Sequence, residues 1–381
     1  MTSRNGWRRI RFGEIAENVT ARVDDPSQAG VERYVGLEHL DPGSLSISRW
    51  GHPSDVEATK LRFWPGDVIF GRRRAYQRKL AVADFDGICS AHALVLRAKP
   101  DVVHPEFLPL FMQSDLFFSR ALAISVGSLS PTINWKTLKE QEFDLPPMAE
   151  QRNIVAMLSA WEASRRAQSA LIDRLGAVKR VMMDAGVEQG VDRELGELLE
   201  VCQYGLSLAS SDEGDVPILG MTNVTHGGVD LSELSYVTLS PAELERYRLL
   251  DRDVLFNRTN SVELVGRTGL YRGHGDVVFA SYLIRLRPTP ELLPEFLNLF
   301  LNSTLGRRRI RARLSKGVSQ ANISATSIKA TRIPLPDISV QEEVVARIEE
   351  LERAIVSAGA QLTRLLALGR VLRSRELSGV H

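Results

Sequence analysis

The sequence contains little cysteine, little lysine and almost no net charge. Two of its 381 residues are cysteine, Cys89 and Cys202, and they lie far apart, so neither a disulfide framework nor a zinc site is indicated. The net charge of +1 argues against polyanion binding over the whole surface but leaves room for local basic patches. No apolar run approaches the ~18 residues that span a bilayer, and residues 1–7 carry no apolar signal core. These absences predict a cytoplasmic protein without a membrane segment.

Catalytic motifs are missing as well. A DNA methyltransferase would need Asp/Asn-Pro-Pro-Tyr/Phe or Pro-Cys and a glycine-rich cofactor loop, but residues 145–148 read Leu-Pro-Pro-Met and Gly273–Gly275 lacks a third glycine. No lysine has an acid two residues before it, which argues against an Asp…Glu-x-Lys nuclease. There is no Walker loop, and the histidines show no metal-ligand spacing. The sequence therefore predicts a binding protein with no catalytic, cofactor-binding or metal-binding residues of its own.

The sequence does contain two copies of one unit. Pro105–Ser114 returns, with conservative changes, as Pro294–Ser303, and from Gly127 and Gly317 onward the two copies match at one constant offset. This period, the separation of Gly127 from Gly317, is far longer than the ~20 to 50 residues of solenoid repeats. The pattern predicts a duplicated domain.

Each copy ends in a heptad pattern. Apolar residues recur at alternating steps of four and three from Val344 to Leu372, and the matching positions of the first copy repeat the seam with the polar entries Arg165, Gln168 and Lys179. The pattern predicts two helices of about 36 to 40 residues, or about 55 to 60 Å at roughly 1.5 Å per residue. Because a globular unit lies between them, we expect the helices to pair as an antiparallel coiled coil. The alternative is two ordinary core helices.

The remaining sequence predicts an α+β or mixed α/β fold for each copy, with strands first, then a helix, then the long helix. Strands are expected at 33–40, 68–71 and 91–97 in the first copy and at 216–221, 254–257 and 277–287 in the second, with helices at 105–124 and 291–313. The predicted domains are two pseudo-symmetric globular units, 1–147 and 187–337, and two long helices, 148–186 and 338–377.

The basic stretch of the first copy, residues 72–79, predicts contact with nucleic acid. It carries five cations and no acid, and such a cluster repels itself unless an anion lies near. The alternative is a solvated hairpin tip. The candidate DNA-binding residues here are Arg72, Arg73, Arg74, Tyr76, Gln77, Arg78 and Lys79.

The second copy places its candidates differently. Its matching loop, Arg258–Ser261, is polar, and its cations gather between Arg307 and Lys316, in greater number than the dipole of the preceding helix would require. The polar loop Gly317–Ser324 carries amide side chains whose geometry pairs with adenine; the alternative is that they cap the loop. The candidates here are Arg258, Asn260, Arg308, Arg311, Lys316, Ser319, Gln320 and Asn322.

These features together resemble the specificity (S) subunits of type I restriction-modification enzymes. Each copy ends in a proline step, Leu145–Pro147 and Ile333–Pro336, then a glutamine beside an acid, Glu150–Gln151 and Gln341–Glu342, and then the long helix. The resemblance to target-recognition domains of that family extends to Gly66–Arg73 and Ala83–Ser90.

The resemblance implies that 1–147 and 187–337 are target-recognition domains, each reading half of a bipartite, asymmetric site in double-stranded DNA. It implies that the helices are a coiled-coil spacer and a docking surface for two methyltransferase (modification) subunits, which translocase-nuclease (restriction) subunits join. S-adenosylmethionine, ATP and Mg²⁺ then belong to those partners. Two alternatives stay open: a stand-alone coiled-coil DNA-binding regulator, and a specificity module of a related phage-defence system.

Overall fold

The computed structural model describes residues 6–208, 211–261, 264–316 and 321–377. The chain forms two compact units, which are described separately. Unit 1 comprises Met1–Ser169 with Gln361–His381, and unit 2 comprises Ala170–Ala360. Each unit therefore contains one globular domain and a part of each long helix.

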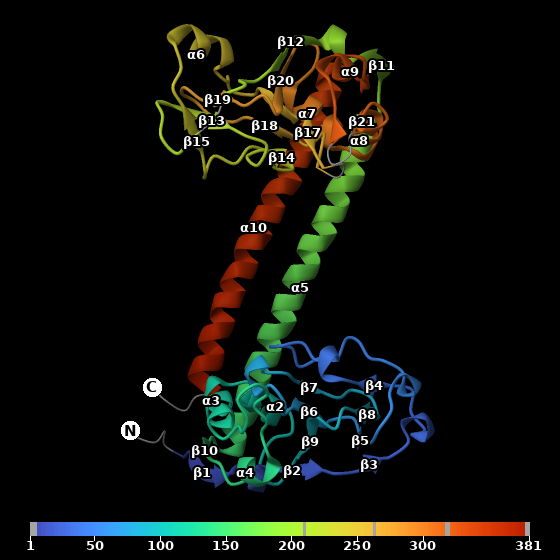
Figure 1. The fold of residues 1–381 in the computed structure, drawn as a ribbon, viewed down its shortest axis with the longest axis vertical. Helices are drawn as coiled ribbons and strands as arrows, with labels where there is room; N and C mark the ends of the chain where they lie inside the picture. The colour runs from blue at the N-terminus through green and yellow to red at the C-terminus, as the bar shows by residue number, and fades with distance from the viewer. Residues whose placement is uncertain (1–5, 209–210, 262–263, 317–320, 378–381) are drawn as a thin grey trace. The chain divides into compact units, whose positions relative to one another are not determined.

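Unit 1 is built around two four-stranded sheets (Figure 1). The first has the order β2-β9-β6-β7 and is antiparallel throughout, the second has the order β3-β5-β8-β4 with a parallel last pair, and β1 pairs with β10. The strands are β1 (Arg8–Arg11), β2 (Ala16–Val19), β3 (Arg22–Val23), β4 (Tyr34–Val35), β5 (Lys60–Phe63), β6 (Val68–Gly71), β7 (Leu80–Val82), β8 (Gly87–Cys89), β9 (Ala93–Ala98) and β10 (Glu142–Leu145). The short helices are α1 (Phe12–Ile15), α2 (Phe107–Met112), α3 (Asp115–Ala123) and α4 (Trp135–Leu138).

Unit 2 repeats this plan around a five-stranded sheet, β12-β20-β16-β18-β14, against which α7 packs (Figure 1). Three smaller sheets have the orders β15-β13-β19, β17-β22-β21 and β11-β23. The strands are β11 (Val191–Glu194), β12 (Leu199–Tyr204), β13 (Val216–Leu219), β14 (Gly227–Gly228), β15 (Ser235–Val237), β16 (Val254–Asn257), β17 (Thr259–Asn260), β18 (Thr268–Leu270), β19 (Val278–Phe279), β20 (Leu283–Pro288), β21 (Ser315–Lys316), β22 (Ala321–Asn322) and β23 (Arg332–Leu335). The short helices are α6 (Pro241–Tyr247), α7 (Pro294–Asn302), α8 (Thr304–Arg311) and α9 (Ala325–Lys329).

The central strands are apolar on both faces because each separates two cores. In β6, Val68 and Phe70 join the core formed with α2 and α3, whereas Ile69 joins the core formed with the second sheet. In β16, Phe256 and Leu255 divide in the same way between two cores of unit 2. Continuous apolar runs are typical of strands covered on both sides. The predicted mixed α/β fold of each copy is therefore confirmed.

A buried ion pair is repeated in both units. The carboxylate of Asp67, 1% exposed, accepts two hydrogen bonds from Arg97, with Nε at 2.7 Å and Nη2 at 2.9 Å. In unit 2, Asp253 is equally buried and accepts two from Arg287, at 2.8 and 2.9 Å. Two-pronged geometry of this kind satisfies both carboxylate oxygens and fixes their orientation. The duplication visible in the sequence thus extends to the contacts that hold neighbouring strands together.

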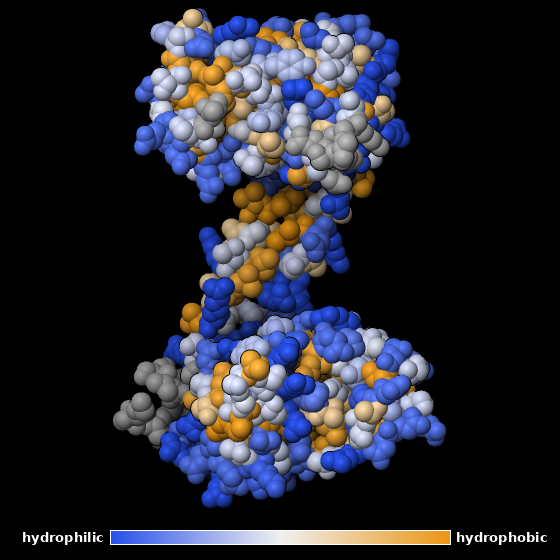
Figure 2. Space-filling view, in the orientation of Figure 1, coloured by the Kyte–Doolittle hydropathy of each residue, from blue (hydrophilic) through white to orange (hydrophobic). Residues whose placement is uncertain are grey.

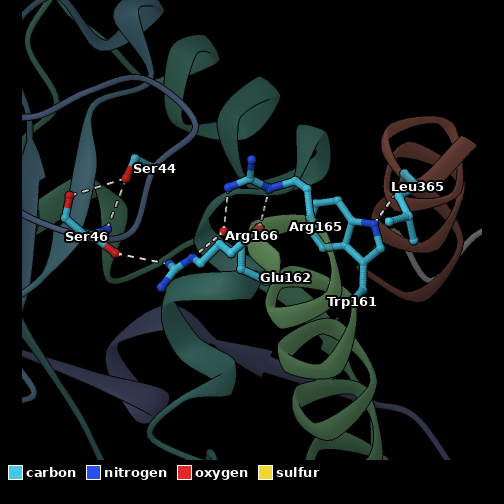
Figure 3. A network of polar contacts seen from close by, with 7 residues as sticks. All are labelled: Ser44, Ser46, Trp161, Glu162, Arg165, Arg166 and Leu365. Atoms are coloured by element: carbon cyan, nitrogen blue, oxygen red, sulfur yellow. Dashed lines mark hydrogen bonds and ion pairs between the residues drawn. The ribbon is translucent and has the colours of Figure 1, made fainter. Parts of the chain in front are cut away.

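The two long helices are α5 (Met148–Val187) and α10 (Ile338–Leu377), each of 40 residues. In unit 1, Trp161 Nε1 donates to the carbonyl oxygen of Leu365 at 2.7 Å, and Gln168 Nε2 donates to Gln361 Oε1 at 3.1 Å (Figure 3 shows the first contact). Residue numbers rise along α5 while those of their partners fall along α10, so the two helices run in opposite directions. The predicted antiparallel pairing is confirmed in this unit.

Unit 2 shows the same antiparallel direction. Lys179 Nζ pairs with Glu352 Oε1 at 2.6 Å, and Gly186 lies against Val344. Seam positions of both helices are buried or half-buried, whereas the positions between them are mostly exposed. Gly369 of α10 is approached by Trp161 of α5, whose indole fills the space that the missing side chain leaves.

Several predicted element boundaries were also wrong. The helix expected at 105–124 is two helices, α2 and α3, because Ser114 accepts a hydrogen bond from Phe117 N and caps α3. Ser303 divides the helix expected at 291–313 in the same way, by capping α8 through Gly306 N. A side-chain cap of this kind starts a new helix. The strands expected at 33–40 and 277–287 are short or interrupted, as β4 and as β19 with β20.

Helix α10 also corrects the expectation about apolar runs. An 18-residue window of α10 has a mean hydropathy of 1.2, and 11% of that window is buried. By length and composition alone, such a helix could cross a membrane. A single helix of this kind is weak evidence for a membrane span. Because α10 pairs with α5 through its seam, its apolar content is accounted for in part by the coiled coil.

Candidate nucleic-acid interface

In unit 1 the basic stretch is tied to two other segments by backbone hydrogen bonds. Arg72 N donates to the carbonyl oxygen of His92 at 3.2 Å, and Ile133 N donates to the carbonyl oxygen of Arg72 at 2.9 Å. The next residue, Arg73, forms a β-bridge with Thr132. Three segments thus meet at the end of β6: the basic stretch, the turn before β9 and the polar loop after α3. We call this junction the unit 1 edge, residues 72–74, 90–92 and 126–133.

Unit 2 builds the same junction from different side chains. Arg258 N donates to the carbonyl oxygen of Tyr282 at 3.0 Å, and Ile323 N donates to that of Arg258 at 3.0 Å. Thr259 pairs with Asn322 in the short sheet β17-β22-β21. We call this junction the unit 2 edge, residues 258–260, 280–282, 315–316 and 321–323. The two edges are assembled from equivalent segments in each copy.

The structure divides the basic stretch into exposed and internally bonded residues. Arg73, Arg74 and Tyr76 are exposed. Arg78 Nη1 lies 2.6 Å from Asp115 Oδ1, its guanidinium stacks over Phe118, and it also donates to the carbonyl oxygen of Gln113. The neighbouring Lys79 Nζ donates to the carbonyl oxygen of Leu37 at 2.8 Å, and Gln77 is half-buried. Arg78 and Lys79 therefore have internal roles that the sequence pattern did not reveal.

The cations of unit 2 divide similarly. Arg308 and Arg311 are exposed one turn apart on α8. Arg309, between them, instead binds both carboxylate oxygens of Asp192, at 2.8 and 3.2 Å, and holds β11 against the end of the domain. Lys316 lies on β21, whereas Ser319 and Gln320 lie outside the described residues.

Two amide candidates of unit 2 lie at its edge. Asn322 Oδ1 accepts a hydrogen bond from Thr259 Oγ1 at 3.2 Å, and the side chain is half-buried. Asn260 is half-buried beside Met221 and accepts a hydrogen bond from Ser261 N. The guanidinium of Arg258 stacks 4.8 Å over the ring of Tyr204. Arg258, Asn260 and Asn322 are therefore brought together by the fold.

Four residues at these edges were not among the predicted candidates: His92 and Thr132 in unit 1, and Tyr204 and Tyr282 in unit 2. His92 and Tyr282 are both exposed and occupy equivalent places, one residue before β9 and β20. Burial and the nearby cations Arg73 and Arg72 lower the pKa of His92, so its ring is neutral at pH 7 and can both donate and accept a hydrogen bond. The equivalence of positions 92 and 282 follows from the strands β9 and β20 that come after them, because the constant offset of the sequence begins only at Gly127 and Gly317.

The unit 1 edge also carries an apolar tip. Leu129 is 93% exposed in the polar loop, and Val126, which bridges to Thr132, is 68% exposed. An apolar tip beside the cations Arg73 and Arg74 can contact thymine methyl groups or stacked bases as well as phosphates.

Neither edge has the chemistry of a catalytic centre. In the part of the chain that the structure describes, no group of three or more His, Cys, Asp or Glu side chains could hold a metal ion. Both cysteines are free thiols, and burial raises the pKa of Cys89 and Cys202, so neither is an activated nucleophile. The exposed arginine, amide and aromatic groups are instead those that proteins use on phosphates and base edges.

Two similar domains with polar and basic edges, joined to paired helices, define a duplicated recognition protein. The model of the type I restriction modification DNA specificity domain matches the chain twice, at residues 55–174 and 188–364. The chain belongs to this family. Its place there is that of the non-catalytic DNA-specificity subunit, as the resemblance led us to predict.

Curated relatives agree with this assignment. The EcoKI specificity subunit of Escherichia coli K12 is 28% identical over 336 residues, covering 78% of this chain and 70% of that protein. The StySPI specificity subunit of Salmonella potsdam is 26% identical, with the same coverage of both chains. The putative MjaX specificity subunit of Methanocaldococcus jannaschii is 27% identical over 45% of this chain and 41% of its own length.

Solved structures show the same fold along the whole chain. A chain from a type I R-M system, solved to explain complex assembly and conformational transition, has a TM-score of 0.67 at 20% identity, covering 100% of this chain and 99% of that one. The HsdS subunit of Thermoanaerobacter tengcongensis has a TM-score of 0.55 at 21% identity, with coverage of 100% and 98%.

Proposed function

We propose that the chain reads the two halves of a bipartite, asymmetric DNA site, one half with each recognition domain, 1–147 and 187–337. The observation that carries this proposal is the duplicated edge: the same three segments meet in both units, yet the side chains that they present differ. Equal scaffolds with unequal side chains suit two half-sites of different sequence.

The proposed role of the helices, 148–186 and 338–377, is to act as a spacer and as a docking surface for two modification subunits. Apolar side chains remain exposed along both helices, as the orange surface there shows (Figure 2). These are Leu171, Val178, Val181, Ile338, Val356, Leu366, Leu368 and Val371. Exposed apolar side chains outside the seam suit contacts with a partner protein.

The chemistry is proposed to reside in the partners. The modification subunits would supply S-adenosylmethionine and transfer the methyl group, and restriction subunits would use ATP and Mg²⁺ to translocate and cut DNA. The chain would then work in the cytoplasm, on double-stranded DNA. A stand-alone regulator is disfavoured by the family assignment, and neighbouring genes for modification subunits would separate the two functions further.

Domain exchange tests the proposal. With its modification subunits, the chain should direct methylation to two short blocks separated by a fixed gap, read by sequencing methylated bases. Replacing residues 1–147 with the matching domain of a relative should change one block, and shortening both helices by one heptad should change the gap. A continuous motif, or a domain exchange that alters both blocks, would refute independent reading. The purified chain alone should neither methylate DNA nor bind S-adenosylmethionine in calorimetry.

A further inference from the structure

Arg72 and Arg258 occupy the same place in the two edges. Each immediately follows a buried central strand, β6 or β16, and each main chain is held on both sides by equivalent hydrogen bonds. The N–H groups donate to residues 92 and 282, and the carbonyl oxygens accept from residues 133 and 323, at 2.9 to 3.2 Å. Residues 92 and 282 each directly precede the equivalent strands β9 and β20, and residues 133 and 323 are related by the constant offset that begins at Gly127 and Gly317. The backbone of each arginine is therefore fixed by the same hydrogen bonds in both domains.

These two arginines differ in charge pairing from several other arginines of their domains. Arg78, Arg97, Arg287 and Arg309 each bind a carboxylate. Within the described residues, no carboxylate lies at ion-pair distance from Arg72 or Arg258, and the Nε atom of each has no hydrogen-bond partner. Among the described residues, the Arg258 side chain contacts the carbonyl oxygen of Ser281 and stacks on the ring of Tyr204. A half-buried guanidinium held without a counter-ion suits an external anion.

The positions around the two arginines differ between the units. Arg73 corresponds to Thr259, Arg74 to Asn260, His92 to Tyr282, and Thr132 to Asn322. Each pair occupies an equivalent backbone position but offers different hydrogen-bonding groups to a base edge. A residue common to both edges cannot account for a difference between half-sites, whereas these four pairs can.

We propose that Arg72 and Arg258 each bind a backbone phosphate at the equivalent position of their half-sites. The four flanking pairs then determine which bases each domain recognises. This rests on the proposed function, since it assigns separate roles within the DNA-reading edges. Common phosphate anchors set the register of each domain on the duplex, and the flanking side chains then reach fixed base pairs. His92 and Tyr282 are thereby assigned as base-reading residues.

The test separates affinity from sequence preference. Arg72→Gln and Arg258→Gln, each assembled with the modification subunits, are titrated by fluorescence anisotropy with a duplex carrying the methylated motif and with a random duplex, across a salt series. Each variant should weaken both complexes by a similar factor, about 5- to 20-fold, and reduce the slope of log K against log salt by about 0.9. The methylated motif should stay unchanged. Arg72→Lys should restore the salt slope, which separates lost charge from lost folding.

The reading positions are tested in the same complexes. His92→Tyr should change base preference in the block read by unit 1, and Tyr282→His should change the other block, as seen by sequencing methylated bases. Arg9→Gln removes an exposed arginine of β1 outside the edge and serves as the charge-matched control. It should leave motif and affinity unaltered.

Each alternative result overturns a defined part. Arg72→Gln with unchanged affinity and salt slope would disprove the phosphate anchor, and Arg72→Gln with an altered motif would make it a base reader. His92→Tyr and Tyr282→His with unchanged motifs would remove the reading role. If the wild-type complex itself methylates no bipartite motif, the proposed function fails, and that outcome is visible before any variant is made.

Discussion

Gly369 of α10 lies so close against the indole of Trp161 on α5 that a Cβ atom at position 369 would overlap the ring. The same indole donates Nε1–H to the carbonyl oxygen of Leu365. A glycine inside a helix normally lowers helix stability by roughly 0.5 to 1 kcal/mol relative to alanine. Here the missing side chain is what allows a large aromatic group to enter the seam.

Gly369→Ala should therefore destabilise the protein, although alanine is the better helix former. We expect a loss of about 1 to 3 kcal/mol from overpacking, measured by thermal or urea unfolding. Gly176→Ala on α5 is the matched control, because a Cβ there meets no atom within 4 Å in the described chain. That variant should be neutral or slightly stabilising. Equal behaviour of both variants would show that the contact with Trp161 contributes nothing.

Two adjacent leucines of α10 test the coiled-coil seam. Leu365 is a half-buried seam residue, whereas Leu366 is 42% exposed. Leu365→Asp places an unpaired carboxylate in the seam and should cost about 3 kcal/mol. Leu366→Asp should change the free energy of unfolding by about 0.5 kcal/mol or less. Unchanged thermal stability of Leu365→Asp would contradict pairing through this seam.

Glu162 makes part of this stability dependent on pH. Hydrogen bonds from Arg165 and Arg166 on the same helix lower the pKa of Glu162 to about 2, against an ordinary value of 4.5, and Arg166 also reaches Ser46 (Figure 3). Because the folded-state pKa lies below the unfolded one, the stabilisation is complete above about pH 4.5 and is lost as pH falls toward 2.

Glu162→Gln should lower the free energy of unfolding at pH 7 by about 1 kcal/mol, since partly exposed ion pairs are screened by solvent. The difference from wild type should shrink as unfolding is measured at lower pH down to about pH 3. Glu343→Gln breaks a more exposed pair with Arg347 and serves for comparison. A difference that is constant from pH 7 to 3 would show that ionisation of Glu162 does not contribute.

The long-range pattern could be predicted from sequence because it is periodic. Heptad spacing located both seams, and the constant offset between the copies revealed two equivalent units. Helix interruptions at Ser114 and Ser303 were missed because apolar content continues across them. Both serines begin a capped helix, so a search for caps in the two copies together would have found them.

The edges could be predicted only in part because they depend on contacts distant in sequence. In the sequence, Arg78 cannot be told apart from the neighbouring arginines. Its partner Asp115 lies 37 residues further along the chain, and only the fold brings the two together. His92 carries no local signal, and it joins the edge through a backbone bond to Arg72. Charge density thus selected one loop of the unit 1 edge, but it did not show which of the loop's cations stay exposed and which form internal contacts.

Gln151 and Gln341 form matching contacts in the two units. Gln151, 2% exposed, accepts a hydrogen bond from His104 N at 2.8 Å and donates to the carbonyl oxygen of Pro146 at 2.9 Å. Gln341, fully buried, accepts from Leu293 N and donates to the carbonyl oxygen of Pro336, both at 2.9 Å. Each amide joins the first turn of a long helix to the proline step before it and to the loop that leads into the domain's own helices.

Replacing either glutamine should therefore loosen the junction between domain and helix. Gln151→Ala leaves the half-buried N–H of His104 and the buried carbonyl oxygen of Pro146 without this partner and should cost about 1 to 3 kcal/mol, as should Gln341→Ala. Gln151→Glu should also destabilise, because a carboxylate accepts from His104 N but cannot donate to Pro146. Gln141→Ala, which removes a half-buried side chain whose amide donates to the carbonyl oxygen of Thr137, is the control and should be near neutral. The free energy of unfolding in urea is measured for all four variants. If the variants at Gln151 and Gln341 lose no more stability than Gln141→Ala, the prolines and apolar packing alone fix the direction in which each long helix leaves its domain.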